Sequence, residues 1–166
     1  MPLILQIAGY SNSGKTTVAE ELVRKFAEKG FKVGVIKHDV HGFEMDQPGK
    51  DTYRYRQAGG MKVGILGPGK GAILIEREVT LEEVFAFYED MDLILVEGFK
   101  TRPFPRIEVV RGEIYQKPFS PPETLVAVVS DLTLEVDCPV FGFGEMEELF
   151  QYLLTYFQVG EDVKIY

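Results

Sequence analysis

The chain contains a glycine-rich segment, Gly9–Thr16, directly behind an apolar run, Leu3–Ala8. The segment reads Gly-Tyr-Ser-Asn-Ser-Gly-Lys-Thr and satisfies the phosphate-loop pattern G-x-x-x-x-G-K-[ST] in full. That pattern is meaningful between a strand and a helix, and an amphipathic helix pattern does follow from Lys15. This context disfavours a chance glycine- and serine-rich turn. The segment therefore predicts a strand, a phosphate-binding loop and a helix, in that order.

Each residue type in this segment has a physical role in holding phosphate. Gly9 and Gly14 let the backbone curl so that its N–H groups point at phosphate oxygens, and the helix start adds a positive dipole end. Lys15 can reach the outer phosphates, and the Thr16 hydroxyl can hold a magnesium ion. We expect a nucleoside triphosphate to contact the loop and first helical turn: Gly9, Tyr10, Ser11, Asn12, Ser13, Gly14, Lys15, Thr16 and Thr17.

Composition restricts the class of protein. A chain of 166 residues and 18.8 kDa is most simply one domain, residues 1–166, with one core. The net charge of −8 argues against a general affinity for nucleic acid or for an anionic membrane. No apolar run approaches the ~20 residues that span a bilayer, and no signal peptide is evident, so a cytoplasmic location is expected. The single cysteine, Cys138, excludes an intramolecular disulfide and a multi-cysteine metal site.

The charge is distributed unevenly along the chain. Residues 1–70 carry 11 Lys and Arg against 7 Asp and Glu, whereas the remainder carries 7 against 19. The basic part holds the phosphate loop, which suits a small polyanionic ligand better than an extended polyanion. Chance clustering on solvated faces explains the excess equally well.

The hydrophobic pattern alternates between strands and helices, which predicts a three-layer α/β fold of the P-loop NTPase type with a mainly parallel sheet. Strands are expected at Leu3–Ala8, Phe31–Lys37, Leu93–Val96, Leu125–Val129 and Val140–Phe143, of which Leu3–Ala8 and Leu93–Val96 are expected to be central. Helices are expected at Lys15–Lys29, Thr52–Ala58, Leu81–Glu89 and Glu145–Phe157. Asp51 is expected to cap the second helix, and Thr80 with Glu83 forms a capping box for the third.

Two further segments are expected to lie outside the central parallel strands. Met61–Leu66 and Ala72–Ile75 flank a Gly-Pro-Gly-Lys-Gly turn, which indicates a β-hairpin or two antiparallel strands near a sheet edge. Ile107–Val110 alternates apolar residues with Glu108 between a proline and a glycine, so we expect an antiparallel, partly exposed strand.

Polar residues follow the predicted parallel strands at their carboxyl ends, where ligands bind in such sheets. Glu97 ends one apolar strand and is the expected acidic partner of a magnesium ion, whereas Asp92 flanks the opposite end. Asp39 follows another strand and could share the metal, position a water molecule or be an ordinary loop residue. We therefore predict a catalytic or metal-binding set of Lys15, Thr16, Glu97 and Asp39.

Asp131 follows a buried strand late in the predicted sheet, where P-loop folds recognise the base. A carboxylate accepts hydrogen bonds from the two N–H groups on the edge of guanine and suits adenine poorly. Asp131 therefore favours GTP, although the common N-K-x-D tetrad is absent and Asp131 could simply open a turn.

The remaining candidates are basic or histidine side chains. His38 and His41 have the spacing H-x-x-H without a third ligand, which favours hydrogen bonds to phosphate or backbone over a transition metal. Arg54 and Arg56 are two residues apart and cannot share a helix face, so at most one is expected to point into the site.

Several blocks of this sequence resemble the molybdopterin-guanine dinucleotide biosynthesis protein B family, MobB. They are Gly9–Thr17, Val35-Ile36-Lys37-His38, Asp46–Arg54, Ala58-Gly59 and Leu95-Val96-Glu97-Gly98-Phe99-Lys100. The resemblance implies a GTP-binding homodimer that assists a guanylyl transferase in attaching GMP to molybdopterin, with slow GTP hydrolysis at most. It also implies that Asp46–Arg54, which includes Lys50, is a mobile loop facing the nucleotide or a partner. Asp39-Val40 departs from relatives, which often have Thr-His there.

Two alternatives stay open. A small-molecule or nucleotide kinase on the same fold would use Arg54 or Arg56 to close over the transferred phosphoryl group. A nucleotide-responsive interaction module would order Asp39–Asp51 around the terminal phosphate and so change its affinity for a partner.

Overall fold

The computed structural model describes residues 1–159. The chain divides into two compact units, one formed by residues 1–38 with residues 88 onward and the other by residues 39–87. The expectation of a single domain stays a prediction. Within residues 1–159, no helix has the length and apolar character needed to cross a membrane.

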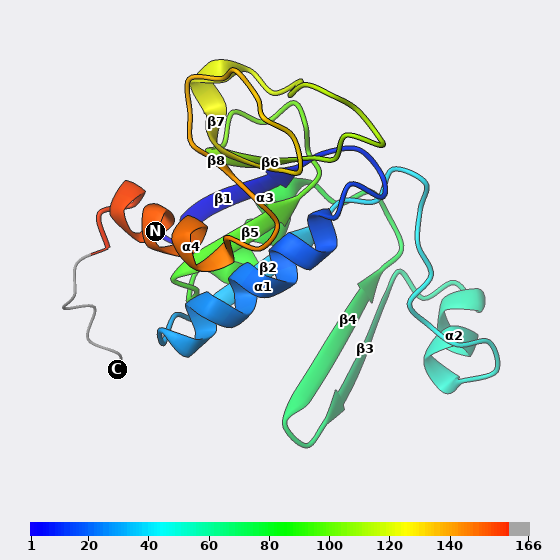
Figure 1. Ribbon diagram of the computed structural model, residues 1–166. Helices are drawn as coiled ribbons and strands as arrows, with labels where there is room; N and C mark the ends of the chain where they lie inside the picture. The colour runs from blue at the N-terminus through cyan, green and yellow to red at the C-terminus, as the bar shows by residue number, and fades with distance from the viewer. Residues whose placement is uncertain (160–166) are drawn as a thin grey trace. The chain divides into compact units, whose positions relative to one another are not determined.

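The first unit is built on a six-stranded sheet in the order β2-β5-β1-β6-β7-β8, and every neighbouring pair is parallel (Figure 1). The strands are β1 (Leu3–Ala8), β2 (Val33–Lys37), β5 (Leu93–Glu97), β6 (Arg106–Val110), β7 (Leu125–Ser130) and β8 (Val140–Phe141). Ile7 of β1 pairs with Glu97 on one side and with Ile107 on the other. The mainly parallel α/β sheet is thus confirmed.

Helices α1 (Lys15–Glu28) and α4 (Met146–Tyr156) cover the same face of this sheet (Figure 1). The Phe26 ring of α1 packs edge-on against Phe31 at 5.2 Å and against Phe150 at 5.0 Å between ring centroids. Aromatic side chains bury large apolar areas and prefer this geometry. The core residues on this face include Leu5, Ile7, Val18, Leu22, Leu93, Leu95, Ile107, Val109, Leu149 and Leu153.

The opposite face of the sheet carries three buried polar side chains, Gln6, Arg106 and Glu108, each at most 1% exposed. Buried polar groups are costly unless they form hydrogen bonds. These side chains form hydrogen bonds with the backbone of two irregular segments, residues 98–105 and 111–121. They therefore fix the loops that follow β5 and β6.

The expectation that Ile107–Val110 is antiparallel and partly exposed is wrong. Strand β6 runs parallel to both β1 and β7, and all of its residues are buried. The misleading signal was Glu108, whose carboxylate accepts hydrogen bonds from the backbone N–H of Phe119 at 3.0 Å and of Ser120 at 2.8 Å. A carboxylate satisfied in this way can be buried, so the alternation did not mark an exposed face.

The second unit contains α2 (Asp51–Gln57), β3 (Lys62–Gly67), β4 (Lys70–Ile75) and α3 (Leu81–Phe85), which continues as a 3-10 turn, Ala86–Tyr88. Strands β3 and β4 form an antiparallel hairpin that is separate from the six-stranded sheet, which confirms the expected hairpin. The capping box is also confirmed, because the Thr80 hydroxyl accepts from the Glu83 N–H at 3.2 Å and Glu83 accepts from the Thr80 N–H at 3.0 Å.

Several predicted element ends differ from the structure, and three of them have a specific local cause. Lys50, not Asp51, occupies the cap position of α2, and the Asp51 carboxylate lies 3.6 Å from Arg54 in the first turn, where it complements the helix dipole. Helix α3 ends at Phe85 because the chain tightens into the 3-10 turn. Strand β8 ends before Gly142, whose N–H donates to the Glu145 carboxylate at 2.6 Å.

Candidate functional site

The phosphate loop follows β1 and curls as its glycines permit. Gly9, Asn12 and Gly14 have φ angles of 145°, 63° and 100°. A Cβ atom on Gly9 would lie 2.7 Å from both the Ser13 hydroxyl and the Val109 carbonyl oxygen. Only glycine fits there without moving the backbone, so the loop lies directly against β6.

The start of α1 is open to an anion. Gly14 is its cap residue, and no side chain of residues 1–159 caps the helix. The first N–H groups of a helix have no partner within the helix and point along the positive end of its dipole. Thr16 and Thr17 lie exposed in this first turn. A phosphate group would therefore find unpaired donors here.

Lys15 lies within a group of charged side chains. Its Nζ donates a hydrogen bond to the Tyr10 carbonyl oxygen at 2.7 Å, across the loop. Burial lowers the pKa of Lys15, the Glu97 carboxylate opposes that shift, and the positive charges of Lys100 and Lys37 add to it. A phosphate oxygen is a stronger acceptor than a neutral carbonyl, so an arriving phosphate competes well for this ammonium group.

Glu97 ends β5 beside the loop, since it pairs with Ile7 two residues before Gly9. Asp92 lies at the other end of β5, where its carboxylate accepts from the Lys32 N–H at 2.7 Å. The Glu97 carboxylate and the Thr16 hydroxyl are hard oxygen donors at the loop, which suits Mg²⁺. Such sites use few protein ligands and complete the coordination with phosphate and water.

A different set of side chains lies on the β6–β7 side of the loop. Arg111 follows β6, and its guanidinium lies 4.3 Å over the Phe143 ring and donates to the Ser13 carbonyl oxygen at 3.4 Å. Asp131 follows β7 and accepts a hydrogen bond from the Gly112 N–H at 2.8 Å. Asp131 is exposed and retains lone pairs for further donors.

The first unit also contains His38, whose ring stacks on Phe99 at 4.2 Å between centroids. Asp39, Lys50 and Arg54 belong to the second unit and are exposed there. Asp39 accepts from the backbone N–H of His41 at 2.9 Å. The roles predicted for these residues at the nucleotide stay predictions.

Arg56 organises the segment before α2. Its side chain is 11% exposed and forms ion pairs with Glu44 at 2.8 Å, Asp46 at 3.4 Å and Glu76 at 2.6 Å. Hydrogen bonds from Arg56 hold the pKa of Glu44 at about 2. Arg56 is therefore committed to carboxylates of its own unit, whereas Arg54 remains 74% exposed.

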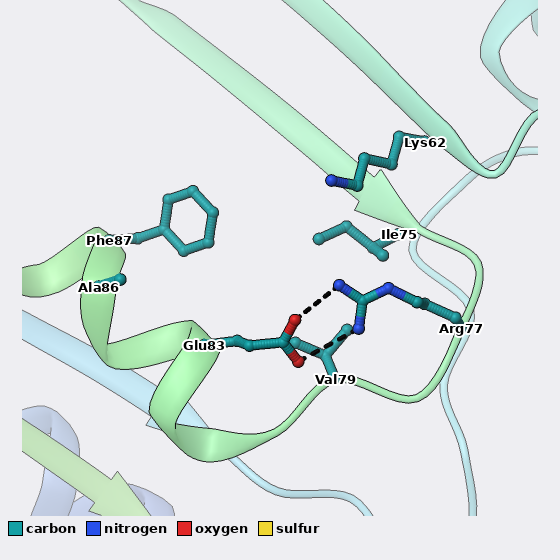
Figure 2. Close-up of a pocket in the computed structure, with 7 residues that line it drawn as sticks. All are labelled: Lys62, Ile75, Arg77, Val79, Glu83, Ala86 and Phe87. Carbon is teal, nitrogen blue, oxygen red and sulfur yellow. Dashed lines mark hydrogen bonds and ion pairs between the residues drawn. The ribbon is translucent and has the colours of Figure 1, made fainter.

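A pocket lies within the second unit, between the end of the hairpin and α3 (Figure 2). Arg77 and Glu83 pair across it at 2.6 Å, which holds the pKa of Glu83 at about 2. The charges of Arg77 and Glu83 compensate each other, and the rest of the lining is apolar except for Lys62. None of the predicted site residues lines it; its lining is Lys62, Ile75, Arg77, Val79, Glu83, Ala86 and Phe87.

Reasoning from the sequence alone missed Arg111 and gave no individual role to Lys100. Arg111 was missed because β6 was read as antiparallel, which placed its end at the opposite edge of the sheet. A parallel β6 would have marked Arg111 as a strand-end residue, like Glu97 and Asp131. Lys100 is named only as the last residue of the Leu95–Lys100 block, and its position depends on aromatic rings distant in sequence.

Known proteins resemble this chain over most of its length. The molybdopterin-guanine dinucleotide biosynthesis adapter protein of Haemophilus influenzae is 32% identical over 154 residues, covering 90% of this chain and 86% of the relative. The protein of the same name from Escherichia coli is 29% identical over 163 residues, which is 93% of each chain. The crystal structure of Bacillus subtilis MobB has a TM-score of 0.73 and 28% identity, covering 98% of this chain and 100% of that one.

The family model described as molybdopterin guanine dinucleotide synthesis protein B matches residues 4–131. The match includes the phosphate loop, the Glu97–Lys100 segment and Asp131, so it extends well beyond a motif that many families share. The resemblance seen in the sequence blocks is confirmed. The chain belongs to the MobB family.

Proposed function

We propose that the chain binds GTP with Mg²⁺ and assists a guanylyl transferase in attaching GMP to molybdopterin. The observation that carries the nucleotide site is the phosphate loop, which brings Lys15 beside Glu97 at the carboxyl edge of a parallel sheet. The names of the relatives, which describe adapter proteins of molybdopterin-guanine dinucleotide biosynthesis, support the pathway.

In this proposal the chain's own groups hold the nucleotide in place. The N–H groups of the loop and first turn bind phosphate oxygens, and Lys15 leaves the Tyr10 carbonyl for the outer phosphates. Thr16 and Glu97 would hold the magnesium ion, which neutralises phosphate charge when bound. Asp131 would accept hydrogen bonds from guanine.

The proposal gives the chain slow hydrolysis at most. A fast kinase or GTPase needs a basic residue that closes over the transferred phosphoryl group. Arg56 is paired with three carboxylates and is not available for that task, so Arg54 is the one remaining candidate of the two arginines. Asp39 as a water-positioning residue, and His38, Lys50 and Arg54 as nucleotide contacts, belong to the same proposal.

We also propose a homodimer that works in the cytoplasm with the transferase or with molybdopterin. The hairpin of the second unit supports an interface, because several of its large apolar side chains are more than half exposed. They are Ile65, Leu66 and Ile73, and Met61, directly before β3, is exposed to a similar extent. Exposed apolar patches of this kind are typical of protein–protein contacts.

The proposal is tested by titrating GTP and ATP into the chain with Mg²⁺ and by adding the chain to a guanylyl-transfer reaction. We expect saturable binding that prefers GTP and increased formation of the dinucleotide, with little phosphate release in the same samples. Equal affinity for ATP would contradict the guanine preference. Rapid phosphate transfer to an added small molecule would support the kinase instead.

A further inference from the structure

Lys100 is held between two aromatic rings although its side chain is exposed. Its Nζ lies 4.8 Å from the ring centroid of Tyr10 and 4.7 Å from that of Phe119. A cation within about 6 Å of a ring face is attracted by the ring. Two such rings, which pack edge to face at 5.2 Å, hold one ammonium group in one place.

The two rings are themselves anchored to strand β6. Tyr10 belongs to the phosphate loop and packs edge-on against Tyr115 at 4.6 Å. The Tyr115 hydroxyl donates to the Val109 carbonyl oxygen at 2.6 Å, and the Phe119 N–H donates to the buried Glu108 carboxylate at 3.0 Å. The position of Lys100 is therefore set by the same strand that supports the loop.

The backbone before Lys100 turns through a strained conformation. Gly98 and Phe99 have φ angles of 95° and 51°, and the second is a left-handed value that non-glycine residues rarely adopt. The Gln6 amide donates to the Phe99 carbonyl oxygen at 2.8 Å, and the Phe99 ring stacks on His38. Backbone strain that is held by surrounding contacts clusters at functional sites.

The turn brings Lys100 close to the phosphate loop and its charged neighbours. Lys100 packs on the ring of Tyr10, whose carbonyl oxygen accepts the hydrogen bond from the Lys15 Nζ at 2.7 Å, and Lys37 pairs with Glu97 in the sheet. Lys15, Lys37 and Lys100 are thus three basic residues near one acidic residue, Glu97, which leaves positive charge for a polyanion. The rings around Lys100 carry no formal charge, and a charge-assisted hydrogen bond to phosphate is stronger than contact with a ring.

We propose that Lys100 binds the terminal phosphate of a nucleoside triphosphate, and that Tyr10 and Phe119 are positioning residues that hold its ammonium group beside the loop. The inference rests on the proposed function, because it adds a residue to that nucleotide site. Lys100 follows β5 on the side of Glu97, which is the side of the proposed magnesium ion and outer phosphates. A lysine placed there makes the site prefer a triphosphate over a diphosphate.

The test compares the affinities of GTP and GDP, both with Mg²⁺, for the wild-type chain and for Lys100→Gln. We expect the variant to lose about tenfold in GTP affinity and little in GDP affinity, so that the ratio of the two falls. Lys29→Gln is the matched control, because it removes the same charge at the C-terminal end of α1 and should leave the ratio unchanged.

The positioning role is tested at Phe119. Phe119→Leu removes one ring face and should reduce the ratio of GTP affinity to GDP affinity by less than Lys100→Gln does. Phe119→Tyr keeps the ring and should retain the wild-type ratio. Circular dichroism and thermal unfolding of each variant establish that the fold is intact. Equal ratios for the leucine and tyrosine variants would overturn the role of the ring.

The outcomes separate this inference from the proposed function. Wild-type chain that binds neither nucleotide would overturn both. Wild-type chain that binds GTP, with an unchanged ratio in Lys100→Gln, would overturn the role of Lys100 alone. Equal losses for GTP and GDP would contradict a contact with the terminal phosphate.

Discussion

The two sides of the phosphate loop differ in chemistry. On the β5–β2 side, Glu97, Lys37 and Lys100 lie near enough to Lys15 to act on its charge, and Lys100 is held between aromatic rings. On the β6–β7 side, Arg111 is stacked on Phe143, and Asp131 is an exposed carboxylate bonded to Gly112. The first side suits phosphates and a metal ion, and the second suits the neutral, hydrogen-bonding base. In the proposed function, the two sides would thus hold the two ends of one nucleotide.

This comparison predicts that changes on the two sides affect different properties of binding. Substitutions on the β5–β2 side should change the dependence on Mg²⁺ and on the number of phosphates. Substitutions on the β6–β7 side should change the preference between guanine and adenine. A substitution that affects both properties equally would break the comparison.

The largest effect is expected for Glu97→Gln. Loss of the carboxylate removes the charged oxygen donor at the end of β5, so the gain in GTP affinity on adding Mg²⁺ should fall by about a hundredfold. Calorimetric titrations over a range of Mg²⁺ concentrations measure this gain. Asp92→Asn, at the opposite end of the same strand, is the control and should leave it unchanged. If Glu97→Gln gains as much GTP affinity on adding Mg²⁺ as the wild-type chain does, another group is the metal partner.

A smaller effect is expected for Asp131→Asn. The amide oxygen can still accept from the Gly112 N–H, but the side chain loses the charge that favours the two donors of guanine. The ratio of GTP to ATP affinity should fall about tenfold, with the magnesium dependence preserved. Asp137→Asn provides a charge-matched control on an exposed residue. If the ratio does not change, Asp131 only shapes its turn.

The smallest effect is expected for Arg111→Gln. The substitution removes the stack on Phe143 and the bond to the Ser13 carbonyl oxygen, both of which support the loop from outside. GTP and ATP affinities should each fall about threefold, because one partly exposed cation–π contact is weak. Affinities for both nucleotides and the melting temperature give the measurement. A selective loss of GTP would instead make Arg111 a base-reading residue.

Much of the fold followed from local sequence signals. The phosphate loop, α1 and the capping box of Thr80 and Glu83 depend on residues a few positions apart, so their patterns were sufficient. The orientation of β6 could not be predicted, because it depends on how Glu108 is satisfied. Its partners, Phe119 and Ser120, lie 11 and 12 residues away in a segment without regular structure.

The candidate site was predicted in part for the same reason. Glu97 and Asp131 follow recognisable buried strands, and their positions at the strand ends could be read directly. Lys100 and Arg111 acquire their positions from the rings of distant residues, which no spacing rule connects to them. Tertiary packing therefore determines which basic residues face the loop.

The central claim is that the loop holds a nucleotide through Lys15, and calorimetric titration of GTP with Mg²⁺ into wild-type chain and Lys15→Ala tests it most directly. Lys29→Ala, at the other end of α1, controls for the loss of charge. We predict saturable binding by the wild-type and control chains, and none by Lys15→Ala, with an unchanged melting temperature. Unchanged GTP affinity in Lys15→Ala would contradict the account.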